Sequence, residues 1–150
     1  MSHTFTNLLT HIIFSTKDRK PIIIPEIKPR LDAYMGGIIR ELNGCPLTIN
    51  GTADHAHLFV RLPATLALVE AVRILKANSS KWVNETFSLR RKFVWQIGYA
   101  GFSVSQSNVP AVIKYIGNQE AHHHRVSFQD ELRQYLKKHG IEYDERYIWK

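Results

Sequence analysis

Two histidines one residue apart are the first feature of the sequence with chemical meaning. They lie in the segment Asp54–Val60 (DHAHLFV), whose apolar residues indicate a β-strand. Side chains alternate between the two faces of a strand, so His55 and His57 share one face. Neutral imidazole is a common metal ligand. The pair therefore predicts half of a metal site, whose remaining ligands must come from another element.

A second group of polar residues has helical spacing. Asn108 as N-cap and Pro110 in the first turn predict the start of a helix. Tyr115, Gln119 and His122 follow at i, i+4 and i+7, which places them on one helix face, away from the apolar positions. A free phenol has a pKa of about 10 and is a weak nucleophile at neutral pH. Near a divalent cation that polarises a phosphoryl group, a tyrosine can attack phosphorus and form a phosphotyrosine.

The rest of the chain supplies the elements that must position these residues. Apolar or alternating runs predict strands, and apolar periodicity of three to four residues predicts helices. The predicted strands are 7–15, 47–52, 56–62 and 102–105; the predicted helices run from Pro25 or Pro29 to Gly44, from Leu66 to Asn84, from Asn108 onward, and from Ser127 to Gly140. This order predicts an α+β fold, a ferredoxin-like antiparallel sheet with helices packed on one face and a C-terminal helical extension.

Composition limits the classes of protein to which the chain can belong. With 150 residues and 44% hydrophobic residues, we expect a single domain over 1–150, with its core at about 5–125 and a C-terminal helix and tail at 126–150. The single cysteine, Cys45, excludes an intrachain disulfide and agrees with a reducing compartment. No apolar run reaches the roughly 20 residues that a membrane-spanning helix needs. We therefore expect a cytoplasmic protein with no membrane partner.

The formal net charge of +7 favours a polyanionic partner such as nucleic acid. We nominate six cationic side chains for DNA contact, from the loop after the first strand and from the second predicted helix: Lys17, Arg19, Lys20, Arg73, Lys76 and Lys81. Taken alone, the helix face is better explained as a solvated charged face. Aromatic residues after Arg90–Lys92 would suit stacked bases, but we expect at least two of Trp95, Tyr99 and Phe102 in the core.

Together these segments resemble the HUH superfamily, named for two histidines around a hydrophobic residue. The resemblance is to the small single-tyrosine transposases of the insertion-sequence 200/605 group and the related REP-associated tyrosine transposases. The matching blocks are Asp54–Leu58, Trp95–Tyr99 with Phe102–Ser105, and Tyr115–His123. The similarity covers most of the chain, from the first strand to about Tyr143. A histidine pair followed sixty residues later by this tyrosine and glutamine helix is a specific pattern.

The resemblance implies a ferredoxin-like core that binds magnesium or manganese. The implied roles are metal ligation by His55, His57 and Gln119, nucleophilic attack by Tyr115, and support of the site by Asp54 and His122. Members of the family cut single-stranded DNA near hairpins, hold the 5′ phosphate on tyrosine, and rejoin strands by the reverse reaction. They commonly act as homodimers, in some cases with the tyrosine helix of one subunit serving the histidines of the other.

Several interpretations remain open at this point. Ala56 is smaller than the valine or leucine often found between the two histidines, which we expect to affect packing and not chemistry. The run His122–His124 is equally well explained as partly exposed residues after a helix end. In function, one alternative is a host-retained nucleic-acid-binding protein of the same fold without mobilising activity. The other is a metal hydrolase of small molecules, for which substrate affinity would be insensitive to salt.

Overall fold

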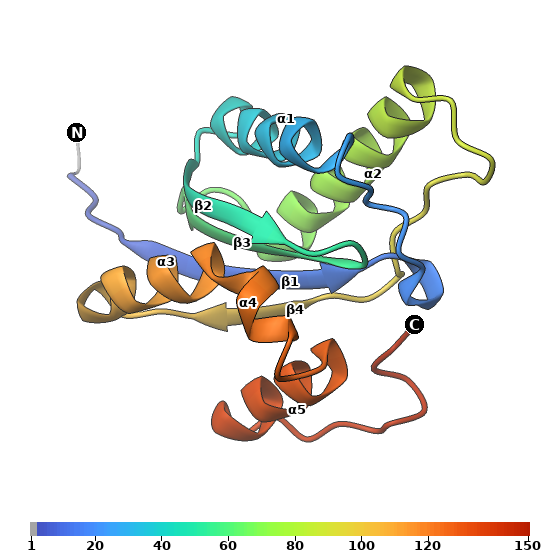
Figure 1. Cartoon of the computed structure of the whole chain (residues 1–150). Helices are drawn as coiled ribbons and strands as arrows, with labels where there is room; N and C mark the ends of the chain where they lie inside the picture. Colours follow the sequence, from blue (N-terminus) through green and yellow to red (C-terminus); the bar gives the residue numbers. More distant parts are fainter. Residues whose placement is uncertain (1–2) are drawn as a thin grey trace.

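The computed structural model describes residues 3–150 and is built around an antiparallel sheet (Figure 1). Its four strands lie in the order β2-β3-β1-β4, and each neighbouring pair is antiparallel. The strands are β1 (Leu8–Ser15), β2 (Cys45–Gly51), β3 (His55–Leu62) and β4 (Ala100–Ser103). The predicted α+β class with one antiparallel sheet is confirmed, although β4 begins two residues earlier than predicted.

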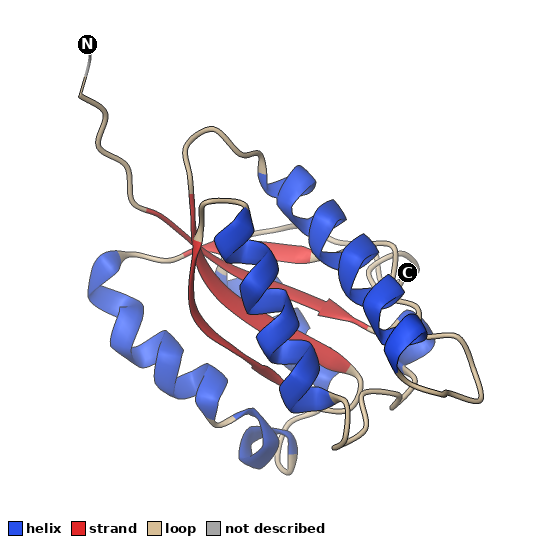
Figure 2. Ribbon diagram, turned by 90° about the horizontal axis from the view of Figure 1, so that it is seen from above, coloured by secondary structure: helices blue, strands red, loops and turns tan. Residues whose placement is uncertain are grey.

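Two helices, α1 (Lys28–Glu41) and α2 (Leu68–Thr86), cover one face of the sheet (Figure 2). The largest group of buried apolar side chains lies between them and the sheet, and it includes Ile12, Phe14, Ala56, Leu58 and Val60 from the strands. Burying one large aliphatic side chain contributes about 1.5–3 kcal/mol, so this face is a main source of stability. Among residues 3–150, no helix is both long and apolar enough to cross a membrane.

The opposite face of the sheet also carries helices, which are α3 (Val109–Gly117), α4 (Gln119–His123) and α5 (Phe128–Lys138). The sheet can hold them because β1 and β3 carry buried apolar side chains on both faces. Leu9 and Phe59 pack with Ile116 of α3, and Ile13 packs in the group that contains Leu132 of α5. Helices α1 and α2 therefore cover one face of the sheet, and α3 to α5 form a second layer on the other face (Figure 1).

The predicted continuous helix after Asn108 is wrong in one respect. It ends at Gly117, and a short separate helix, α4, begins at Gln119. Asn118 between them has φ −106° and ψ 21°, outside the helical region. Glycine and asparagine are weak helix formers, which explains the interruption at this pair. The break changes the direction of the chain so that Gln119 becomes fully buried beneath the tyrosine helix.

The aromatic residues before and within β4 divide as predicted. Trp95 and Phe102 are buried in the core, whereas Tyr99 is 38% exposed. The indole of Trp95 donates to the hydroxyl of Ser79 at 2.9 Å, which satisfies its buried N–H group. The expectation that at least two of the three are core residues is confirmed.

Candidate active site

His55 and His57 lie at the start of β3, and both are buried. Their strand neighbours Ala56 and Leu58 belong to the core under α1 and α2. The alternation of β3 therefore turns both imidazoles toward the other layer of helices, as the sequence predicts. In the sheet, His57 lies opposite Ile13 of β1, which fixes its place near the centre of the sheet.

Four side chains converge beneath α3, and their ligand atoms lie within 4.8 Å of one another: His55, His57, His123 and Glu131. The amide oxygen of Gln119 joins them, 3.2 Å from His55 Nε2 and 3.0 Å from His123 Nε2. Imidazole nitrogens with a carboxylate and an amide oxygen form a donor set for a divalent cation, with Mn²⁺ and other first-row metals well suited and Mg²⁺ served by the oxygens. The residues present thus fit a divalent metal ion.

Two members of this group, His123 and Glu131, were not predicted as ligands from the sequence. His123 follows Tyr115–His122 in an apparent histidine run, and α4 directs it inward because of the break at Asn118. Glu131 comes from α5, directly after the capping residues Ser127 and Asp130, and it is only 2% exposed. A histidine run after a tyrosine motif was a usable signal for His123. Nothing in the spacing of Glu131 distinguished it from a solvated first-turn carboxylate.

Each imidazole of the pair is held through its second nitrogen. His55 Nδ1 lies 2.8 Å from Asp54 Oδ1 and 3.0 Å from the Thr52 hydroxyl, so the predicted supporting residue Asp54 does contact the site. His57 Nδ1 lies 2.7 Å from Nε2 of His11, a buried residue of β1 that the sequence analysis did not nominate. Both Nε2 atoms therefore face the cluster. Such outer partners orient metal-binding histidines and fix their tautomers.

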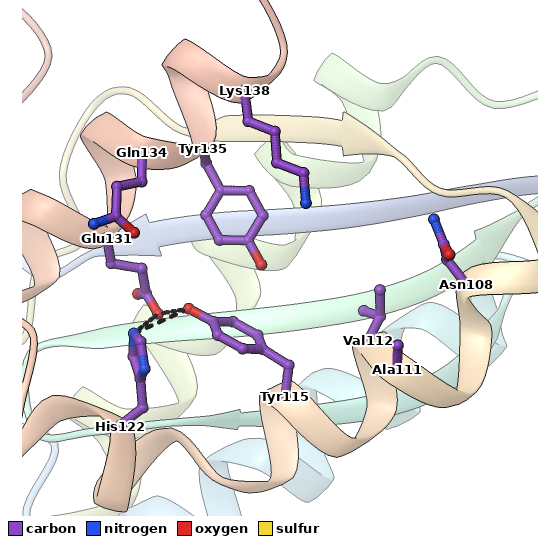
Figure 3. A pocket seen from close by; sticks show the side chains of 9 residues that line it. All are labelled: Asn108, Ala111, Val112, Tyr115, His122, Glu131, Gln134, Tyr135 and Lys138. Atoms are coloured by element: carbon purple, nitrogen blue, oxygen red, sulfur yellow. Dashed lines mark hydrogen bonds and ion pairs between the residues drawn. The ribbon is translucent and has the colours of Figure 1, made fainter.

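Tyr115 lies near the C-terminal end of α3, with its hydroxyl at the edge of the cluster (Figure 3). The hydroxyl donates to Oε2 of Glu131 and lies 3.3 Å from Nε2 of His122. The side chain of His122 is thus placed beside the tyrosine, as expected for a supporting residue. Burial raises the pKa of the Tyr115 phenol above its ordinary value. The hydrogen bond with Glu131 and the negative charge of Glu131 raise it further. The phenol is therefore protonated at neutral pH.

Glu131 connects the two halves of the site, because its two oxygens have different partners. Oε1 lies 3.0 Å from His57 Nε2 and 3.1 Å from His123 Nε2, whereas Oε2 accepts from Tyr115. Burial alone would raise the pKa of Glu131, but the hydrogen bonds with His123 and His57 hold it below its ordinary value. Burial lowers the pKa of His57 to about 4, even though Glu131 opposes the shift. At neutral pH the carboxylate is anionic and His57 is neutral, the forms that bind metals.

The cations nominated for DNA contact fall into two groups. Lys17, Arg19 and Lys20 follow β1, at the same end of the sheet as the histidines, because Ser15 pairs with His55 in the sheet. The three from α2 lie on the opposite face: Arg73 pairs with Glu70, Lys81 lies 3.9 Å from Glu85, and Lys76 donates to the carbonyls of Gln96, Ile97 and Gly98. The structure does not bring the α2 cations to the tyrosine.

Comparison with known proteins gives a family for this arrangement. The family model described as "Transposase IS200 like" matches residues 4–119, which include the histidine pair, Tyr115 and Gln119. Transposases of the insertion sequence element IS200 from Salmonella typhimurium and Salmonella typhi are each 25% identical over 124 residues. The match covers 79% of this chain and 81% of each relative.

Two solved structures have the same fold. A candidate transposase of Deinococcus radiodurans R1 matches with a TM-score of 0.64 and 20% identity, over 79% of this chain and 95% of that one. A REP-associated tyrosine transposase bound to a REP hairpin matches with a TM-score of 0.61 and 14% identity, over 84% of this chain and 76% of that one. The family match over most of the chain decides the assignment. This chain belongs to the IS200-like transposases, the insertion-sequence 200/605 group of the HUH superfamily.

Proposed function

We propose that this protein is a metal-dependent endonuclease and strand transferase for single-stranded DNA, with Tyr115 as its nucleophile. One observation carries the proposal: the Tyr115 hydroxyl donates to Glu131, whose other oxygen lies within the His55 and His57 cluster. A nucleophile held this close to a candidate metal site can act on a phosphate bound at that site. Family membership supports the reaction class, and the contacts of Tyr115 support the role that we propose for it.

We assign His55, His57 and Gln119 as the ligands of Mg²⁺ or Mn²⁺, and we add His123 and Glu131 Oε1 as further candidate ligands. A bound cation would polarise the scissile phosphate and stabilise the negative charge that develops on it. The chain itself contributes the orientation of the metal-binding atoms. Because the Nδ1 atoms contact Asp54 and His11, both imidazoles of the pair keep Nε2 directed at the same space.

In the proposed reaction, Tyr115 Oη attacks phosphorus. The bond between Oη and phosphorus forms while the bond between phosphorus and the 3′ oxygen breaks, and that oxygen takes a proton from water to become a 3′ hydroxyl. The phenolic proton passes to Oε2 of Glu131, which already accepts its hydrogen bond. The 5′ phosphate remains on Tyr115. Attack by another 3′ hydroxyl reverses these steps and rejoins strands without external energy, because one phosphodiester replaces another.

The substrate and partners follow from the relatives and are proposals for this chain. One structural relative is bound to a REP hairpin, so we propose single-stranded DNA with hairpin ends as the substrate. We also propose a homodimer, because β2 and β4 end the sheet and each offers an edge for pairing with a second copy. The exposed free thiol of Cys45 agrees with a cytoplasmic location.

The test uses labelled single-stranded DNA from the flanks of the gene, with and without Mn²⁺, on a denaturing gel. The wild-type protein should form a covalent adduct that depends on Mn²⁺. Tyr115→Phe should form none and should still bind the hairpin. Adduct formation by the Phe variant would overturn the assignment. Hairpin binding without any Mn²⁺-dependent cleavage would favour a host-retained binding protein instead.

A further inference from the structure

Two hollows flank the tyrosine, one on each side. The first lies between α3 and α5, and Figure 3 shows its lining, with Tyr115, Glu131 and His122 at one end and Asn108 at the other. The second lies against α3, α4 and the turn that follows α4. Each has a volume of about 380 Å³. They share Ala111, Tyr115 and His122, so the nucleophile stands on the ridge between them.

Each hollow is lined by at least one cationic side chain that has no partner among the described residues. Lys138 lines the first hollow, and Lys114 and Arg125 line the second. All three are exposed, and within residues 3–150 their side chains make no ion pair or hydrogen bond. By contrast, the ammonium of Lys76 on α2 is occupied by backbone carbonyls. The charges beside Tyr115 are thus available to an external anion.

The first hollow also offers groups suited to a nucleotide. Figure 3 shows the hydroxyl of Tyr135 directed into the space that Lys138 and Tyr115 border, with the amide of Asn108 across from it. The side-chain amide of Gln134 lies on the same rim. Amides can hydrogen-bond base edges, and a cation beside an aromatic ring suits a sugar-phosphate chain with an unpaired base. A volume of this size lies at the lower end of small-ligand pockets, which suits one nucleotide.

We propose that the strand to be cut runs through both hollows and crosses the ridge at Tyr115, with Lys138 binding the backbone on one side of the scissile phosphate and Lys114 and Arg125 binding it on the other. This inference rests on the proposed function, because a phosphate at Tyr115 necessarily has a nucleotide on each side. The path lies on the face of α3 to α5, and the α2 cations nominated from the sequence are not part of it.

The test measures the affinity of the full-length protein for a fluorescein-labelled single-stranded hairpin oligonucleotide in EDTA, from low to high salt. Each neutralised phosphate contact contributes about 0.7 to the slope of log K against log salt for a single strand. Lys138→Gln, Lys114→Gln and Arg125→Gln should each reduce the slope by about 0.7. Lys137→Gln is the matched control, since Lys137 is the exposed neighbour of Lys138 on α5 and lines neither hollow.

The outcomes separate this inference from the proposed function. If the wild type binds and forms the Tyr115 adduct but the three variants keep the wild-type slope, the strand path is wrong and the proposed function stands. An equal reduction of the slope in Lys137→Gln would also overturn the path, because the reduction would then reflect the overall charge of the protein and not a contact with a phosphate. If the wild type neither binds single-stranded DNA nor forms an adduct, both the strand path and the proposed function are wrong. A reduced slope in all three variants, with Lys137→Gln unchanged, supports the path.

Discussion

The two faces of the sheet have different roles, although both receive side chains from the same strand. On β3, Ala56 and Leu58 point into the apolar core under α1 and α2, while His55 and His57 point into the polar cluster under α3 to α5. The first face stabilises the fold by removing apolar surface from water. The second keeps buried polar groups that need hydrogen-bond partners, and all of the buried side-chain nitrogen and oxygen atoms among residues 3–150 have one. We therefore expect substitutions at alternate residues of β3 to change stability and chemistry separately.

The largest expected effect on stability comes from the apolar face. Leu58→Ala should reduce the free energy of unfolding by about 2–5 kcal/mol, because Leu58 is fully buried and the truncation leaves a cavity. Chemical denaturation in EDTA measures the loss. Manganese affinity of the folded variant should remain that of the wild type. A variant that lost metal affinity as strongly as stability would break the separation of the two faces.

The complementary change on the other face is His57→Ala. It removes a proposed ligand, so calorimetric titration should show manganese affinity reduced by at least about 100-fold, the upper range for loss of an outer partner. Leu58→Ala serves as the control on the adjacent residue of the strand. Unchanged affinity in His57→Ala would remove this histidine from the proposed metal site.

A smaller effect is expected at His11, which contacts His57 without facing the cluster. With a metal on Nε2 of His57, Nδ1 carries a proton that His11 Nε2 accepts. His11→Leu removes the acceptor and should weaken manganese binding by about 10–100-fold. His11→Gln restores an acceptor and should recover most of the affinity. Equal losses in the two variants would show that His11 serves packing alone.

The last prediction concerns pH. Burial lowers the pKa of His57 to about 4 and also lowers that of His11, so the unfolded chain binds more protons than the native one between about pH 4 and 6.5. Without metal, the free energy of unfolding should therefore rise with pH across this window and fall as the solution is acidified. His57 contributes at most about 1.4 kcal/mol per pH unit to this change in the free energy of unfolding. His57→Ala should show a shallower dependence; an identical one would contradict the shift.

Periodicity and turn signals were enough to predict the four strands, the three long helices and the shared face of the histidine pair. They were also enough to bring Tyr115 and Gln119 together, because both lie in one local segment. Sequence could not predict Glu131 or His11 as members of the site, since they arrive through tertiary packing of α5 and β1, whereas the histidine run after the tyrosine motif was a usable signal for His123. The break at Asn118 was not predicted, because the regular spacing of Tyr115, Gln119 and His122 was given more weight than the weak helix formers Gly117 and Asn118.

The proposed function requires that Tyr115 is the residue that becomes covalently bound to DNA. The most direct measurement is tandem mass spectrometry of the protein after incubation with single-stranded hairpin DNA and Mn²⁺, followed by nuclease trimming and proteolysis. We expect one modified peptide, with the nucleotide phosphate on Tyr115. Tyr135 lines the same hollow and provides an internal comparison. Modification of Tyr135 instead, or DNA cleavage that leaves no tyrosine modified, would show that Tyr115 is not the nucleophile.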